Sequence, residues 1–249
     1  MNAQNVLDSP EREAEVRAIL RSKGSLRALY REYYNCYLDV LNRTPAGGDI
    51  LELGSGAGFV KEVIPEMITS DVIPYSGIDR VIDATQLPFA DHSLRAVFLM
   101  NVFHHTSNVE KLLSELNRCL KIDGRALMID QYPGIPARWI YRYLHHEPYD
   151  PNANAWQFTS GGPVSGANGA LAWIVFERDR TSFVSKFPEL KIERFETHTP
   201  LRYWLTGGLR RWTLLPISLY PFASAFDSLL IAIWKKFGSF VNIELRRTG

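Results

Sequence analysis

Short apolar runs alternate with polar, turn-forming stretches along the first half of the chain. A helical pattern covers about 10–43, and apolar runs then predict strands near 49–53, 67–71, 80–83, 95–101 and 125–131, separated by helical stretches. Strands that alternate with helices in this way predict right-handed crossovers and a parallel sheet. The pattern therefore indicates an α/β fold.

The second half of the chain contains two more strand-like segments and a long insertion. Residues 190–198 and 241–247 predict the last two strands, with 200–240 inserted between them. The segment from Tyr149 to Gly169 is rich in Gly, Asn, Pro and Ser. This composition predicts a lid or substrate loop, or else an ordinary surface loop.

Length and composition narrow the class of protein. With 249 residues, of which 46% are hydrophobic, the chain can bury one large core, so we expect a single domain over 1–249. A net charge of +1 gives no support for nucleic-acid binding. Two distant cysteines and an N-terminus without the apolar core of a signal peptide predict a cytoplasmic protein without a disulfide framework.

The stretch ILELGSGAGF, residues 50–59, is the most informative part of the chain. An apolar strand ends in an acid and is followed by Gly54, Gly56 and Gly58, which let the backbone turn sharply and approach a ligand closely. We expect a side chain at any of the three glycines to fill the space that the ligand needs. A glycine triplet alone also fits a simple turn.

The glycine spacing and Glu52 discriminate between ligands. A dinucleotide site has the spacing G-x-G-x-x-G and rests a pyrophosphate on a helix N-terminus, whereas this chain has G-x-G-x-G. Glu52 lies two residues before the first glycine, where a carboxylate repels a pyrophosphate and attracts an ammonium or sulfonium group. The stretch therefore favours S-adenosylmethionine over NAD.

Two aspartates follow at the ends of the next apolar segments. Asp71 comes 19 residues after Glu52, near the offset of about 20 residues at which an acid meets ribose hydroxyls in a doubly wound fold. Asp83 could accept a hydrogen bond from the adenine amino group, while Ala84 leaves room for the ring. Either aspartate alone could cap a helix or a turn, but three acids in this order favour a cofactor site.

With these residues the chain resembles the class I S-adenosylmethionine-dependent methyltransferases, in particular the small-molecule branch called type 11. The resemblance covers about 40–135, and a subgroup of the family also resembles the second half. The matching segments are ELGSGAG (52–58), SDV (70–72), DATQLPF (83–89), NVFHH (101–105), LLSELNRCLKIDGRALMI (112–129), LHHEPYD (144–150) and ANGALAWIVFERDR (167–180).

The resemblance implies a Rossmann-like seven-stranded sheet with an antiparallel last strand, helices on both faces and a helical or loop-built substrate cap. It divides the domain into an N-terminal helical cap (1–45), a cofactor-binding core (46–135), a substrate loop or lid (136–185) and the last two strands (190–249). The cofactor-binding residues that it implies are Glu52, Gly54, Ser55, Gly56, Gly58, Asp71, Val72, Asp83, Ala84 and Asn101.

Two pairs of adjacent histidines are the candidates for proton transfer and substrate binding. His104 and His105 follow the fourth predicted strand, at the carboxyl end where open α/β sheets bind ligands. A neutral imidazole there could remove a proton from a substrate hydroxyl, phenol or amine, so both are catalytic candidates. The alternative is that the pair only packs against the cofactor or caps the next helix.

The second pair, His145 and His146, precedes Glu147. Adjacent histidines point in divergent directions on a helix, unlike the i, i+4 pairs that share a zinc ion, so we expect no metal site. A polar wall of the substrate pocket is expected instead, with Glu147 orienting an imidazole or the substrate. The substrate-binding candidates are His145, His146, Glu147, Tyr149 and Asn168.

The insertion 200–240 is apolar in its interior and basic at its flanks. Asp227 is the only charge between Trp212 and Trp234, and prolines at 216 and 221 argue against a membrane-spanning helix. Two interpretations remain: an apolar cap buried over the substrate, which we favour, or a basic amphipathic surface that lies on anionic lipid as a peripheral membrane contact.

Together these features predict S-adenosylmethionine-dependent methyl transfer to a small, apolar or lipid-like acceptor by direct displacement. O-, N- and C-methylation all stay open, because function depends on the site rather than on the fold. The alternative from another class is a non-catalytic S-adenosylmethionine-binding scaffold.

Overall fold

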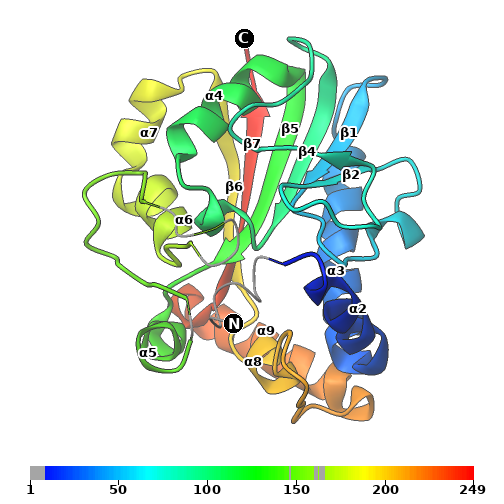
Figure 1. Ribbon diagram of the computed structural model, residues 1–249. Coiled ribbons are helices and arrows are strands. Elements are labelled where there is room, and N and C mark those ends of the chain that lie inside the picture. The colour runs from blue at the N-terminus through cyan, green and yellow to red at the C-terminus, as the bar shows by residue number, and fades with distance from the viewer. Residues whose placement is uncertain (1–8, 146, 160–161, 163–165) are drawn as a thin grey trace.

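The strands form one seven-stranded sheet in the order β3-β2-β1-β4-β5-β7-β6 (Figure 1). The computed structural model describes residues 9–145, 147–159, 162 and 166–249. Strand β7 runs antiparallel to both of its neighbours, β5 and β6, while the other pairs are parallel. The predicted α/β sheet with an antiparallel last strand is confirmed. The strands are β1 (Asp49–Leu53), β2 (Ile68–Asp71), β3 (Arg80–Val81), β4 (Leu94–Met100), β5 (Leu120–Gln131), β6 (Leu190–His198) and β7 (Phe240–Arg247).

Helices cover both faces of the sheet, as expected (Figure 1). Alternate residues of β4 explain why: Val97 and Leu99 lie in one buried cluster with α4, α6 and α7, whereas Ala96 and Phe98 lie in a second cluster with α3. The helices are α2 (Arg12–Ser22), α3 (Gly24–Leu41), α4 (Val109–Cys119), α5 (Ile135–Tyr143), α6 (Leu171–Trp173), α7 (Arg180–Lys186), α8 (Arg202–Thr206) and α9 (Tyr220–Ile233).

The single helix predicted for 10–43 was wrong, because the chain breaks at Lys23 between α2 and α3. The Lys23 side chain is 4% exposed, and its ammonium donates to the carbonyls of Gly208 at 2.7 Å and Arg210 at 3.0 Å. Burial lowers the pKa of Lys23 to about 8. The break therefore ties the N-terminal helices to the insertion.

The helical stretches predicted between the first strands were also wrong. The β1–β2 connection holds only the single 3-10 turn Val60–Glu62, and the loops from β2 to β3 and from β3 to β4 contain no helix. Each of the three connections carries a proline, at 65, 74 and 88, which interrupts helical hydrogen bonding. Helices α2 and α3 pack beside this half of the sheet (Figure 1).

The insertion joins β6 to β7 and contains α8, α9 and two 3-10 turns, Ile217–Leu219 and Lys235–Phe237. Helices α8 and α9 lie below the sheet, close to α5 (Figure 1). Within the described residues, no helix is long and apolar enough to cross a membrane.

Candidate active site

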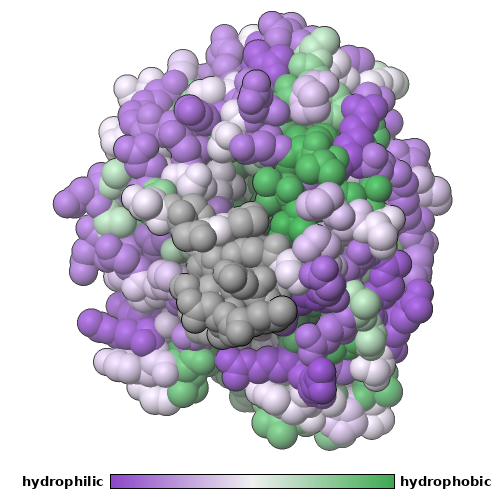
Figure 2. All heavy atoms as spheres, viewed as in Figure 1, coloured by the Kyte–Doolittle hydropathy of each residue, from purple (hydrophilic) through white to green (hydrophobic). Residues whose placement is uncertain are grey.

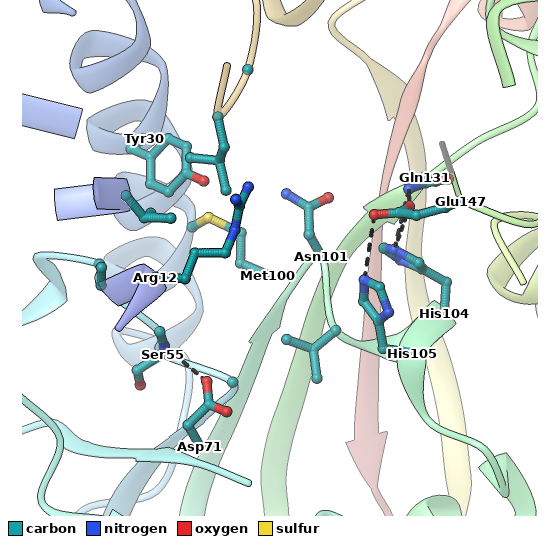
Figure 3. A pocket seen from close by; sticks show the side chains of 18 of the residues that line it. Arg12, Tyr30, Ser55, Asp71, Met100, Asn101, His104, His105, Gln131 and Glu147 are labelled. Atoms are coloured by element: carbon teal, nitrogen blue, oxygen red, sulfur yellow. Dashed lines mark hydrogen bonds and ion pairs between the residues drawn. The ribbon is translucent and has the colours of Figure 1, made fainter. Parts of the chain in front are cut away.

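A cavity of about 690 Å³ opens at the carboxyl ends of β1, β2 and β4. Its walls come from the glycine loop 54–58, helices α2 and α3, the turn after β4, and the insertion around Tyr203 and Trp204. Such a volume suits a cofactor together with a small ligand. Figure 3 shows Asn101 between Arg12 on one side and the group of His105 and Glu147 on the other.

The glycines of the loop have different roles. A Cβ atom at Gly54 would meet Val102 Cγ2 at 2.2 Å, and one at Gly58 would meet the Tyr34 hydroxyl at 2.8 Å, so packing requires these two glycines. Of the three, only Gly56 has no atom within 4 Å of its Cβ position, and its φ of +49° also favours glycine. The expectation that all three leave space for the ligand was therefore wrong for Gly54 and Gly58.

Glu52 is buried at the end of β1, and its Oε2 has no hydrogen-bond partner among the described residues. Burial, with a smaller contribution from the charge of Asp71, raises the pKa of Glu52 to about 7. A buried carboxylate oxygen that lacks a partner beside a cavity is a place for a cationic ligand group.

Asp71 ends β2 beside the glycine loop, where its Oδ2 accepts from the Gly56 amide at 3.0 Å and its Oδ1 accepts from the Ile73 amide at 3.0 Å. Burial raises the pKa of Asp71 above its usual value, although these backbone hydrogen bonds act against the increase. The carboxylate is thus held in one position on the cavity wall.

The other predicted cofactor residues also line the cavity, namely Ser55, Val72, Asp83, Ala84 and Asn101. Asp83 Oδ1 accepts from both the amide and the hydroxyl of Thr85 at 2.8 Å, so it also forms a turn of the kind expected as the alternative. Asn101 has a φ of +55°, a left-handed conformation that asparagine tolerates better than most residues. Its backbone amide donates to the carbonyl of Ile129 at 2.8 Å.

His104 and His105 lie on the 3-10 turn Phe103–His105 after β4, and both face Glu147 (Figure 3). His104 Nδ1 donates to Asp130 Oδ1 at 2.7 Å, and its Nε2 lies 3.2 Å from Glu147 Oε2. His105 Nδ1 donates to the carbonyl of Gly166 at 2.9 Å, and its Nε2 lies 3.6 Å from Glu147 Oε1. The structure therefore brings one candidate from the second histidine segment onto the first pair.

Opposite pKa shifts separate the two imidazoles. Burial lowers the pKa of His104, but the carboxylates of Asp130 and Glu147 outweigh burial and raise it to about 10. Burial and the neighbouring His104 lower the pKa of His105 to about 4. Burial acts to raise the pKa of Glu147, but the histidines around it hold it well below its usual value.

The remaining substrate candidates divide into two groups. His145 lines the cavity with its Nδ1 3.5 Å from Glu147, whereas His146 lies outside the described residues. Tyr149 and Asn168 do not line the cavity. Tyr149 stacks on Tyr141, and Asn168 Oδ1 accepts from the amides of Asp150 and Ala170, so both have structural contacts instead.

Several residues of the cavity were not expected from the sequence. Arg12, Tyr30 and Gln131 point into it (Figure 3), and Asp130 orients His104 from behind. Asp130 and Gln131 end β5, the strand beside β4, so the rule that ligands bind at carboxyl strand ends could have found them. No pattern in the sequence identified Arg12, because it lies on a helix outside the matching motifs.

Comparisons with known proteins identify a methyltransferase segment in the chain. Residues 51–128 match the family described as "Methyltransferase domain". The "Uncharacterized methyltransferase YcgJ" of Bacillus subtilis is 31% identical over 102 residues, a match that covers 33% of this chain and 40% of that protein. Residues 51–128 therefore match a methyltransferase domain, in agreement with the resemblance of this part of the sequence to the class I S-adenosylmethionine-dependent methyltransferases. Its match spans less than half the length of this curated relative.

Solved structures resemble this chain over most of its length. One chain, from the complex between the Haloferax volcanii Trm112 methyltransferase activator and a protein classed as a methyltransferase, has a TM-score of 0.51 at 14% identity. The match covers 94% of this chain and 98% of that one. Geranyl diphosphate C-methyltransferase from Streptomyces coelicolor has a TM-score of 0.48 at 17% identity, and the match covers 89% of this chain and 82% of that one. These likenesses concern the fold alone.

The cavity fits S-adenosylmethionine, the cofactor of this family. Gly56 faces open space at the loop, and the unpartnered Glu52 oxygen could receive the methionyl ammonium. Asp71 would accept the ribose hydroxyls and Asp83 the adenine amino group, while Val72 and Ala84 would flank the ring. When bound, the cofactor supplies a methyl group on a positively charged sulfur.

Proposed function

We propose that the protein transfers the methyl group of S-adenosylmethionine to a small, apolar or lipid-like acceptor by direct displacement. The observation that carries the proposal is one continuous cavity, which runs from the glycine loop and Asp71 to His104, His105 and Glu147. A cofactor and an acceptor can therefore lie side by side in it. Alignment of the two reactants can supply on the order of 7–11 kcal/mol of barrier reduction.

Aromatic and aliphatic side chains support an apolar acceptor. Beyond the histidines the cavity is walled by Tyr141 and Leu144 from the α5 segment, and by Tyr203, Trp204 and Trp212 from the insertion. The polar side chains at this end of the cavity are those of the histidine cluster with Gln131, and Arg210 from the insertion. An acceptor with one polar, proton-bearing group on an apolar body would fit this division.

Transfer of a labelled methyl group tests the proposal. The protein would be incubated with S-adenosylmethionine labelled on the methyl carbon and with fractionated small-molecule and lipid extracts, and the products would be followed by mass spectrometry. We expect one labelled product class, which forms more slowly with the Asp71→Ala variant when the cofactor concentration is below saturation. A protein that binds the demethylated cofactor but labels nothing in any fraction would instead be the non-catalytic scaffold.

The insertion supports a second proposal, peripheral contact with an anionic membrane. Its inner part, at Tyr203 and Trp204, lines the cavity, but the apolar side chains of α9 face outward. Phe222 is 73% exposed and Ile233 is 66% exposed, whereas the only buried residues of α9 are Tyr220 and Asp227. The insertion thus has the features of both interpretations, a cap on its inner side and an exposed apolar surface on its outer side.

Neighbouring residues extend this outer surface. Figure 2 shows apolar side chains at the lower edge of the molecule, where Figure 1 places α5, α8 and α9. The cations Arg210, Lys235 and Lys236 are exposed at the two ends of the apolar part of the insertion. Apolar side chains flanked by Lys and Arg favour an anionic lipid surface as the partner. The exposed apolar residues are Trp212, Leu214, Ile217, Leu219, Phe222, Phe226, Leu229, Ile233, Trp234, and, on the α5 segment, Trp139, Tyr143 and Leu144.

A further inference from the structure

Three ligand groups converge where the turn after β4 meets the segment after α5. One ligand atom from each of His104, His105 and Glu147 lies within 4.8 Å of the other two. Nε2 of His104 is 3.2 Å from one oxygen of Glu147, and Nε2 of His105 is 3.6 Å from the other. The Gln131 amide donates to Glu147 Oε2 at 2.6 Å and helps to orient the carboxylate. Ligand atoms at about 2.0–2.1 Å from one tetrahedral metal ion stand about 3.3 Å apart, so the spacing is that of an edge of such a site.

Hydrogen bonds on the far side of each ring fix which nitrogen carries a proton. Asp130 and the Gly166 carbonyl are acceptors, so Nδ1 of His104 and Nδ1 of His105 are both N–H donors. Nε2 is then the atom of each ring that faces Glu147, and Nε2 of His104 also lies 3.1 Å from the Gln131 amide nitrogen. A metal ion at Nε2 of His104 would take the place of the proton that this atom holds in the metal-free protein. A metal-ligating histidine commonly has this arrangement, with its other nitrogen donating to a carboxylate or to a backbone carbonyl.

Two imidazole Nε2 atoms and a carboxylate that face one another favour a cation between them. A single proton can join Glu147 to one imidazole but not to both, whereas a metal ion accepts all three donors. We propose that His104, His105 and Glu147 bind a divalent first-row transition-metal ion such as Zn²⁺ or Fe²⁺. The two charges of the ion would also balance the carboxylates of Asp130, which is buried, and of Glu147, which is partly buried.

The donor set selects the class of metal. Mg²⁺ and Ca²⁺ bind through oxygen ligands, whereas two imidazoles and one carboxylate are the ligands of catalytic zinc sites and of non-haem iron sites. Both classes leave coordination positions open. His104, His105 and Glu147 all line the cavity, so an open position would face the acceptor space.

This inference deepens the proposed function, on which its role in the reaction rests. A hydroxyl or phenol that occupies the open position would have its pKa lowered by the ion, as water does. The histidines would then act as ligands and not as general bases. The sequence predicted no metal site because His145 and His146 are adjacent and diverge. In the structure the relevant ligands are different ones, because Glu147 lies against His104 and His105.

Zinc binding by the purified protein tests the inference without an acceptor. The chelator-stripped chain would be titrated with Zn²⁺ in competition with a chromophoric chelator, and the absorption spectrum of the Co²⁺-loaded protein would identify the ligands. We expect one equivalent of metal. His104→Ala, His105→Ala and Glu147→Gln should each bind at least 100-fold more weakly, and Asp130→Asn about 10- to 100-fold more weakly.

Two controls distinguish loss of the metal site from unspecific zinc binding and from unfolding. His92→Ala removes an exposed histidine elsewhere and should bind zinc normally, and binding of the demethylated cofactor by calorimetry shows that each variant is folded. Less than a tenth of an equivalent of metal in the native chain, or equal binding by Glu147→Gln, would overturn the inference. If the protein binds no metal but forms labelled product, the metal site is rejected and methyl transfer is retained. If the protein binds metal but labels no acceptor, the proposed methyl transfer is rejected.

Discussion

The guanidinium of Arg202 donates from Nε to Asp227 Oδ2 at 2.9 Å, and both side chains are buried between α8 and α9. Arg202 also donates to Glu32 Oε2 and Ser224 Oγ, so its charge is shared among several acceptors. Helix α9 therefore contacts the body of the protein through Asp227 and Ser224 as well as through Tyr220, while most of its large apolar side chains are exposed. This is the reverse of the usual orientation of a surface helix.

Breaking this ion pair should loosen the insertion. We expect Arg202→Met to lower the free energy of unfolding by about 3–5 kcal/mol, because Asp227 would lose its counter-charge in the interior and keep only its hydrogen bonds from the backbone amides of residues 201 and 202. Urea unfolding followed by tryptophan fluorescence measures the loss. The double variant Arg202→Met with Asp227→Leu should regain most of the stability, and a single variant as stable as the native chain would show that the pair contributes little.

Cofactor affinity should depend on Asp71. Its carboxylate would make charge-assisted hydrogen bonds to the ribose, so Asp71→Ala should weaken binding of S-adenosylmethionine and of its demethylated product by about 1–3 kcal/mol. NAD should not bind. Calorimetry measures all three ligands, and unchanged affinity in the variant would remove Asp71 from the site.

Cofactor binding should also depend on pH through Glu52. Burial raises its pKa to about 7, so in the ligand-free protein the carboxyl is mostly protonated below that pH. A ligand ammonium needs the ionised form, and affinity should therefore rise about tenfold per pH unit from pH 5.5 towards 7 and level off above. The stability of the ligand-free protein should change in the opposite direction. Because the pKa of Glu52 is higher in the folded than in the unfolded chain, the contribution of this group to the free energy of unfolding is lost as pH rises through 7. Glu52→Gln should bind with a flat profile over this range, and a slope that persists in the variant would assign it to another group.

The histidine pair should govern the chemical step. Under either role, as ligands or as a base, His104→Ala and His105→Ala should slow methyl transfer by roughly 100-fold or more. Affinity for the demethylated cofactor should change little, because neither histidine belongs to the cofactor half of the cavity. Single-turnover kinetics with the labelled acceptor measure the rate, and normal turnover by both variants would leave the pair with a structural role.

Membrane contact should depend on the exposed phenylalanines of α9. Burying one phenylalanine contributes about 1.5–3 kcal/mol, so Phe222→Ser and Phe226→Ser should each weaken binding to phosphatidylserine-containing vesicles about tenfold or more. Binding should also fall as salt rises, because Lys and Arg near the surface are screened. Val184→Ser, which removes an exposed apolar residue on α7, is the matched control. Absence of sedimentation with vesicles at low salt would leave α9 without this partner.

The sequence predicted the parts of the protein that follow local rules. Strand β1 and the loop after it were recognisable because an apolar run, an acid and spaced glycines occur within ten residues. Glu147 could be named as a substrate candidate, but not as a neighbour of His104, because their contact joins segments more than 40 positions apart. The direction of α9 was not predictable either, since an apolar helix that faces solvent has the same composition as one that is buried.

The pairing of His198 with Phe240 places the two ends of the insertion on neighbouring strands. Because β6 and β7 are antiparallel there, a tight turn of a few residues could replace everything between them without changing the register of the sheet. The glycine loop, Asp71 and the histidine cluster all lie on other connections. The length and the outer surface of the insertion can therefore change without disturbing the sheet, provided that its contacts with Lys23 and Glu32 are kept. Such changes would alter the acceptor side of the cavity and leave the glycine loop and Asp71 as they are.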